Sequence, residues 1–328
     1  MPEQSSDFSG CIARMRELSR GKDTITGHWE IAGILSEQAL PTYPLGFPEE
    51  FCREFSRQIG RGLLCNRPYS GTQVLCDYGE RHLQSGDLIL YTSADSVCQL
   101  AAYEELVPVE QLYEYCEIAR SMLKVGRVIA RPFRGKAPAF ERTSARRDFS
   151  LSPPGTTMLD VLRENGLETI AVGKIEDIFA RRSVSRAIHT EDNRDGMERT
   201  TAVAQEEFQG LCFVNLVDFD MKYGHRNDIE GYARALSELD RWLGSFLPLL
   251  EREDLLLLTA DHGCDPSFPG TDHTREYTPM LAWGSSVKHS RNLRTRAGFS
   301  DIGKTVLEYF GLPNTLPGSS FWREISLS

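Results

Sequence analysis

The chain has 328 residues, enough for two domains or for one large domain with an insertion. Its net charge of -10 at pH 7 gives no general attraction to nucleic acid or anionic lipid, so a phosphorylated ligand would need local basic residues or bound metal. No apolar run approaches the roughly 18 to 20 residues that span a bilayer, and we expect neither a nucleic-acid nor a membrane partner.

The eight cysteines are scattered along the chain, and none forms a C-x-x-C pair. The polar opening MPEQSSDFSG carries no signal-peptide core. Free thiols in a reducing compartment are therefore the simplest interpretation, and we predict a cytoplasmic protein.

The N-terminal half of the chain alternates short elements with proline-rich crossings. Proline-rich stretches at 40–50 and 150–155 mark crossings between domains. We therefore predict an α+β domain over 39–153, inserted into a core formed by 1–38 and 154–328. The expected elements of this half are a helix over 11–20, strands over 87–93 and 126–133, and an amphipathic helix over 109–123.

Beyond residue 155 the sequence alternates helices with near-continuous apolar strands. Strands of this kind predict a mostly parallel sheet that helices cover on both faces, which is an α/β fold. In such sheets the functional site lies beyond the carboxyl ends of the strands. We expect helices over 156–166 and 230–250, and strands over 168–175, 210–220, 254–263 and 278–284.

Acidic and imidazole side chains follow two of these strands. Asp220 and His225 come after one strand, where they are either ligands of a divalent cation or residues of an ordinary turn. Asp261 and His262 come after another, and burying them without a partner would cost roughly 2–7 kcal/mol each, which a metal or a hydrogen-bonded turn would offset. His273 follows in G-T-D-H-T-R-E. Ligands of these types without a thiolate favour Mn²⁺, Zn²⁺ or Mg²⁺.

A threonine near the start of the chain is a candidate phosphate carrier. Thr24 stands in G-K-D-T-I-T-G-H-W-E-I, just before a stretch able to begin a helix. The amides and positive dipole at a helix N-terminus favour a phosphate, and a hydroxyl beside a metal could attack phosphorus. The alternative is that Thr24 or Thr26 is only an N-cap.

Several long motifs lie in nearly collinear order from about residue 11 to residue 322. The motifs are G-K-D-T-I-T-G-H-W-E-I-A-G, R-P-Y-S-G-T, Y-T-S-A-D-S-V, G-R-V-I-A-R-P-F, V-G-K-I-x-D-I-F, V-D-F-D-x-x-Y-G-H and T-A-D-H-G-x-D-P-x-x-P-G-T-D-H-T-R-E-Y. Together they resemble the phosphopentomutase family of the alkaline phosphatase superfamily.

The resemblance implies an alkaline-phosphatase-like core, and an isomerase that interconverts ribose or deoxyribose 1-phosphate and 5-phosphate. In the family a phosphothreonine, matched here by Thr24, donates its phosphoryl group to a pentose phosphate. A bisphosphate forms, reorients and returns a phosphoryl group to the threonine. Two Mn²⁺ ions support the reaction.

The resemblance also assigns ligands to the two metals. Asp220, His225 and His273 would hold one metal, and Asp261 and His262 would hold the other.

Three further residues lie in segments that resemble the family's sugar- and phosphate-binding parts. These are Asp95, Arg131 and Lys174. On local grounds Asp95 could equally be a turn residue, and the two basic residues could be solvated surface charges. The inserted domain would be the cap that closes over the substrate.

The N-terminus departs from the family pattern. Phosphopentomutases open with a buried strand that ends in an Asp ligand of the second metal, and Asp7 does not match it. About sixty residues of the pattern have no counterpart, so we expect a gap in the core and weaker binding of the metal at Asp261 and His262. The reading frame would then begin further upstream, or the chain would be a truncated and inactive remnant. A metal-dependent phosphohydrolase of the same superfamily is the other alternative.

Overall fold

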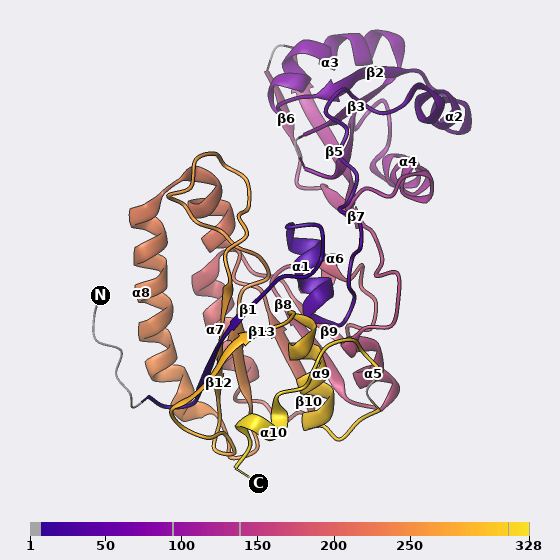
Figure 1. The fold of residues 1–328 in the computed structure, drawn as a ribbon. Helices are drawn as coiled ribbons and strands as arrows, with labels where there is room; N and C mark the ends of the chain where they lie inside the picture. The colour runs from indigo at the N-terminus through magenta and orange to yellow at the C-terminus, as the bar shows by residue number, and fades with distance from the viewer. Residues whose placement is uncertain (1–7, 94, 138, 314, 328) are drawn as a thin grey trace. The chain divides into compact units, whose positions relative to one another are not determined.

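The computed structural model describes residues 8–93, 95–137, 139–313 and 315–327, so Asp7 lies outside the described part. The chain divides into two compact units (Figure 1). One unit combines Met1–Ala39 with Ser152–Ser328, and the other is Leu40–Leu151. The roles expected of a core and a cap domain stay predictions. No described helix is long and apolar enough to cross a bilayer.

The first unit confirms the expected α/β class. Its purely parallel sheet has β8 (Glu168–Val172) in the centre, flanked by β10 (Gly210–Val214) and β9 (Arg186–Ile188). Both β8 and β10 are the near-continuous apolar runs that a parallel sheet buried on two faces requires. The strands expected at 168–175 and 210–220 are therefore confirmed, with earlier ends.

Helices cover both faces of β10. Val214 packs in one apolar cluster with Val203 at the end of α7 (Asn193–Val203). The neighbouring Phe213 points the other way, and its ring centroid lies 5.6 Å from that of a histidine in α1 (Thr24–Ile31). The layering is helix, sheet, helix.

A second sheet in this unit is mixed. Its order is β11-β12-β1-β13, and β12 runs antiparallel to both of its neighbours, while β1 and β13 are parallel. The strands expected at 254–263 and 278–284 are confirmed. The bounds are β1 Cys11–Met15, β11 Leu256–Thr259, β12 Thr278–Trp283 and β13 Arg291–Arg296.

The helix expected over 11–20 is wrong, because β1 occupies its first half. Cys11, Ala13 and Met15 are buried and alternate with more exposed residues, which is the period of a strand. The strand is paired on both sides, by β12 and β13. Pairing within the sheet outweighs the helical preference of the Arg, Glu and Leu residues that follow.

Both strands that lead to the candidate site are sheet edges within the described residues. β10 pairs only with β8, and β11 pairs only with β12. All of their residues are half-buried. The amphipathic helix α8 (Ile229–Phe246), expected over 230–250, buries only Gly231, Ala235 and Phe246. The described chain therefore covers these apolar elements only in part.

The remaining helical segments connect and cover the strands of the first unit. The helix expected over 156–166 is present as α5, and it begins with a capping box formed by Thr157 and Asp160. The bounds are α5 Met158–Glu164, α6 Ile175–Ile178, η1 Phe219–Tyr223, η2 Gly224–Arg226, η3 Leu247–Leu249, α9 Ser300–Tyr309 and α10 Trp322–Ile325.

The second unit is an α+β domain around one sheet with the order β2-β3-β4-β5-β6, in which β7 also pairs with β5. α2 and α4 pack on one face of the sheet and α3 packs on the other. The strands and the helix expected in this unit are confirmed. The bounds are α2 Glu49–Ile59, β2 Leu63–Pro68, α3 Gln73–Ser85, β3 Leu88–Thr92, β4 Val97–Tyr103, α4 Val109–Met122, β5 Arg127–Lys136, β6 Ala139–Arg142 and β7 Arg147–Ser150.

Candidate metal centre

Asp220, His225 and His273 form one cluster. Asp220 lies in η1 and His225 in η2, both beyond the carboxyl end of β10. One carboxylate oxygen of Asp220, Oδ1, is 3.2 Å from Nε2 of His225 and 3.1 Å from Nε2 of His273. The three side chains therefore direct their donor atoms to one point.

The other ring nitrogens of this cluster are held by backbone carbonyls. Nδ1 of His225 is 2.6 Å from the carbonyl oxygen of Thr271, and Nδ1 of His273 is 2.7 Å from that of Lys22. A carbonyl accepts only from a protonated nitrogen, so each contact places a proton on Nδ1, and Nε2 is the atom that faces Asp220 and could face a metal.

Asp261 and His262 form a second cluster with residues of α1. Oδ2 of Asp261 lies 3.5 Å from Nε2 of His262 and 3.1 Å from Nδ1 of His28. The hydroxyl of Thr24 is 3.4 Å from Nε2 of His262. Nδ1 of His28 also lies 2.8 Å from the carbonyl oxygen of Thr24, so the His28 imidazole contacts both Thr24 and the Asp261 carboxylate.

The two clusters adjoin. The rings of His262 and His273 stack with their centroids 3.7 Å apart. Donor atoms of Asp220, His262 and His273 all lie within 4.8 Å of one another, so these three could hold one metal ion. The sequence prediction gives His262 to the other metal, and the geometry places it within reach of both clusters.

The clusters favour ionised carboxylates. Burial alone would raise the pKa of Asp220, but hydrogen bonds from His225 and His273 outweigh it and hold that pKa well below its ordinary range. Burial also raises the pKa of Asp261, but the positive charges of His262 and His28 outweigh burial, and the net effect is a pKa well below the ordinary range. A divalent cation supplies the same positive charge, so these groups fit a metal chemically.

Thr24 stands at the first helical position of α1. The side chain of Asp23 is the N-cap and accepts from the amide of Thr26 at 3.0 Å, so neither threonine is the cap. Gly27 lies one turn on, and a Cβ built there would be 1.7 Å from the Asp261 carbonyl oxygen. Only glycine permits this close approach of the helix to the end of β11.

The structure places the other three predicted residues at different points. Nζ of Lys174 is 2.6 Å from Sδ of Met221, beside the η1 segment that carries Asp220. Asp95 is exposed in the second unit and contacts Ser93, with 3.5 Å between Oδ2 and Oγ. Lys174 therefore lies next to the metal-binding segments of the first unit, whereas Asp95 belongs to the second unit.

Arg131 is half-buried on β5 and donates from Nε to Gln99 Oε1 at 3.2 Å. Burial lowers the pKa of its guanidinium, and the nearby Arg146 lowers it further. In the β4–β5 register Arg131 is opposite Ala101, six residues beyond Asp95. Asp95 itself precedes β4 in a turn, closed by a hydrogen bond from the Val97 amide to the Asp95 carbonyl, so the strand register does not set its distance from Arg131.

Two residues that the sequence analysis does not assign lie against the clusters. His28 contacts Asp261, and its place in the threonine motif is a signal that could have identified it. Burial alone would lower the pKa of His28, but the Asp261 carboxylate raises it overall. Sγ of Cys264 is 3.8 Å from Asp220 Oδ1, and burial raises the pKa of this thiol to about 12.

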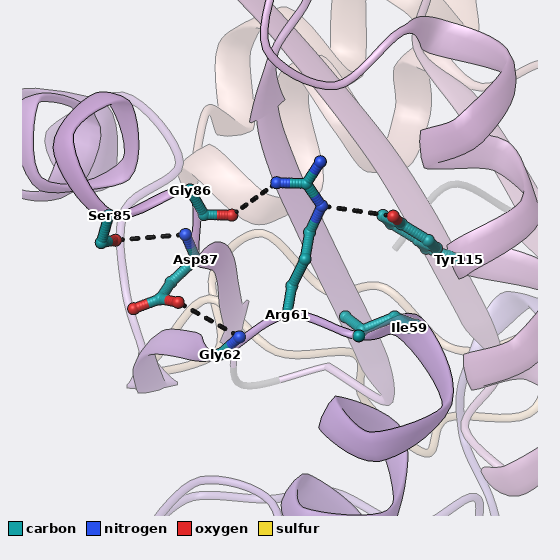
Figure 2. A pocket seen from close by; sticks show the side chains of 8 residues that line it. Ile59, Arg61, Gly62, Ser85, Gly86, Asp87 and Tyr115 are labelled. Carbon is teal, nitrogen blue, oxygen red and sulfur yellow. Dashed lines mark hydrogen bonds between the residues drawn. The ribbon is translucent and has the colours of Figure 1, made fainter.

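A cavity of about 450 Å³ lies in the second unit, and none of the predicted site residues is among those that line it (Figure 2). Arg61 crosses it and donates to the Gly86 carbonyl at 2.8 Å and to the Tyr115 hydroxyl at 3.2 Å. Asp87 accepts from the amide of Gly62 at 3.1 Å. These polar groups bind one another and so connect the segments that follow α2 and α3. The contacts among the lining residues are therefore structural, and they do not form a catalytic arrangement.

The chain matches a known superfamily and has similar relatives among known proteins. Residues 24–314 match the Metalloenzyme superfamily, so the chain belongs to the alkaline-phosphatase-like class of metalloenzymes. The phosphopentomutase of Lachnoclostridium phytofermentans is 56% identical over 316 residues, which are 95% of this chain and 81% of that protein. That of Clostridium novyi is 52% identical over 96% of this chain and 82% of that protein. The chain belongs to the phosphopentomutase family.

Among solved structures, a protein from Pyrococcus horikoshii covers 93% of this chain and 88% of its own chain, with a TM-score of 0.49 at 13% identity.

Proposed function

We propose that this chain is an isomerase that interconverts ribose or deoxyribose 1-phosphate and 5-phosphate, with Thr24 as the phosphate carrier. The observation that supports this most is the position of the Thr24 hydroxyl, 3.4 Å from His262 Nε2 and beside two Asp–His clusters. It occurs in a chain 56% identical to a phosphopentomutase.

We assign two Mn²⁺ ions to the site. Asp220, His225 and His273 would hold one, and Asp261 and His262 the other. Carboxylate oxygens and imidazole nitrogens, without a thiolate, suit this metal. The ions would stabilise charge on the phosphoryl oxygens and on the attacking and leaving oxygens.

Thr24 can carry a phosphate because it begins α1. The helix dipole and the first amides of α1 favour a dianion there. Phosphothreonine passes its phosphoryl group to the free hydroxyl of a pentose phosphate, so the P–O bond to Thr24 breaks as the bond to the sugar forms. The sugar hydroxyl loses a proton and the threonine oxygen gains one. The bisphosphate then returns its other phosphoryl group to Thr24.

Substrate binding is assigned to Lys174 in the first unit and to Asp95 and Arg131 in the second, which would act as a cap. Lys174 and Arg131 would meet phosphate oxygens, and Asp95 a sugar hydroxyl. We also propose a cytoplasmic location, which the eight free cysteines support.

The test is an assay of the purified protein with ribose 1-phosphate or ribose 5-phosphate and Mn²⁺. Interconversion by the wild type, its loss in Thr24→Ala and its partial retention in the control Thr24→Ser would support the proposal. Release of inorganic phosphate without isomerisation would identify a phosphohydrolase instead. A chain that binds no Mn²⁺ and turns over neither sugar would be an inactive member of the family.

A further inference from the structure

We propose that Arg275 and Lys22 are positioning residues that fix the segment leading to Thr24 against the metal ligand His273. The inference rests on the proposed function, because it concerns the distance between the phosphate carrier and the metal centre. Residues 16–23 have no regular helix or strand, so the placement of Thr24 depends on what holds this segment (called here the carrier loop).

Arg275 binds the middle of the carrier loop through three successive carbonyl groups. Nη1 donates to the carbonyl of Ser19 at 2.9 Å, and Nη2 donates to those of Arg20 at 2.6 Å and Gly21 at 2.9 Å. The planar guanidinium is suited to this task because it presents several N–H donors in a fixed geometry. A lysine at this position could reach the carbonyls but would not hold them in one plane.

Lys22 and His273 bind each other reciprocally. The Lys22 ammonium donates to the His273 carbonyl at 2.6 Å and pairs with Asp272 at 2.7 Å. In return, His273 Nδ1 lies 2.7 Å from the Lys22 carbonyl oxygen. The same imidazole therefore offers one nitrogen to the carrier loop and the other to Asp220.

The start of the carrier loop has a separate anchor. The buried carboxylate of Glu30 accepts from the amides of Leu18 and Ser19, and also from that of Phe299 at the start of α9. With Glu30 at one end of the loop and α1 at the other, Arg275 and Lys22 fasten the residues in between. Metal binding at His273 should therefore order the carrier loop, and an ordered loop should favour metal binding.

The test combines hydrogen exchange with kinetics on the full-length protein. Mn²⁺ is added to the wild type, to Arg275→Gln, to Arg275→Lys and to the control Arg234→Gln, an exposed residue of α8. We expect Mn²⁺ to slow amide exchange in residues 19–23 of the wild type and of the control. In Arg275→Gln this protection should be lost although Mn²⁺ still binds, and Arg275→Lys should recover part of it.

The kinetic expectation is a fall in kcat of about 10- to 100-fold in Arg275→Gln, with KM for ribose 5-phosphate nearly unchanged. Wild-type protection of residues 19–23 in Arg275→Gln would overturn the inference, and so would a loss of Mn²⁺ binding and folding together, because that result describes a purely structural arginine. If the wild type fails to isomerise pentose phosphates, the proposed function fails, and the exchange measurement still decides the role of Arg275.

Discussion

Glu17 should make the folded protein less stable as the pH rises. Its side chain is only 4% exposed, and neither carboxylate oxygen has a hydrogen-bond partner among the described residues. Burial raises its pKa to about 8; Arg275, 3.3 Å away, opposes this, while the carboxylates of Glu30, Asp23 and Asp261 add to it. The folded state therefore keeps a proton that the unfolded chain releases near pH 4.5.

The sign and size of the effect follow from that difference. Between about pH 4.5 and pH 8 the folded state binds more protons, so the free energy of unfolding falls with rising pH. The full difference corresponds to roughly 5 kcal/mol at about 1.36 kcal/mol per pKa unit. We expect about half, 2–3 kcal/mol, because the chain and water relax around a buried charge.

Urea unfolding of the wild type and of Glu17→Gln, measured in EDTA at pH 4.5, 6.5 and 8.5, tests this reasoning. The variant should match the wild type at the lowest pH and exceed its stability at the highest. Glu238→Gln, at an exposed position of α8, is the control and should follow the wild type throughout. Parallel pH profiles of Glu17→Gln and the wild type would refute the argument.

Two further predictions concern the packing around the site. Gly27→Ala should abolish Mn²⁺-dependent turnover and destabilise the protein by about 2 kcal/mol or more, because its Cβ meets the Asp261 carbonyl. Gly244→Ala, in open space on α8, should stabilise it by up to about 1 kcal/mol, and equal effects of the two changes in thermal unfolding would contradict this. Iodoacetamide at pH 7.5 should label the exposed Cys76 before Cys264, whose pKa is about 12, and peptide mass spectrometry showing the reverse order would be incompatible with the described site.

Much of the α/β core could be predicted because its parallel strands are near-continuous apolar runs. Asp220 and Asp261 each follow the carboxyl end of an apolar strand, where α/β folds place ligands, although β10 and β11 lie in different sheets of the described chain. Strand β1 could not be predicted in this way, since its five residues become a strand only by pairing with β12 and β13. Local propensity carries no information about such partners.

The contacts that hold the site residues in place could not be predicted from the local sequence either. Lys22 and His273 are 251 positions apart, so their reciprocal contacts exist only in the folded chain. Several neighbouring polar side chains could have capped α1, and the sequence does not show which of them accepts from a free amide of the first turn. In the structure that residue is Asp23.

The central claim is that Thr24 carries the phosphoryl group, and mass spectrometry of the peptide that contains it tests this most directly. The protein is incubated with Mn²⁺ and a pentose bisphosphate and quenched in acid, alongside Thr24→Ala. The account predicts one phosphate on Thr24 in the wild type and none on the variant. Turnover of ribose 5-phosphate with Thr24 unmodified, or with the phosphate on another residue, would contradict it.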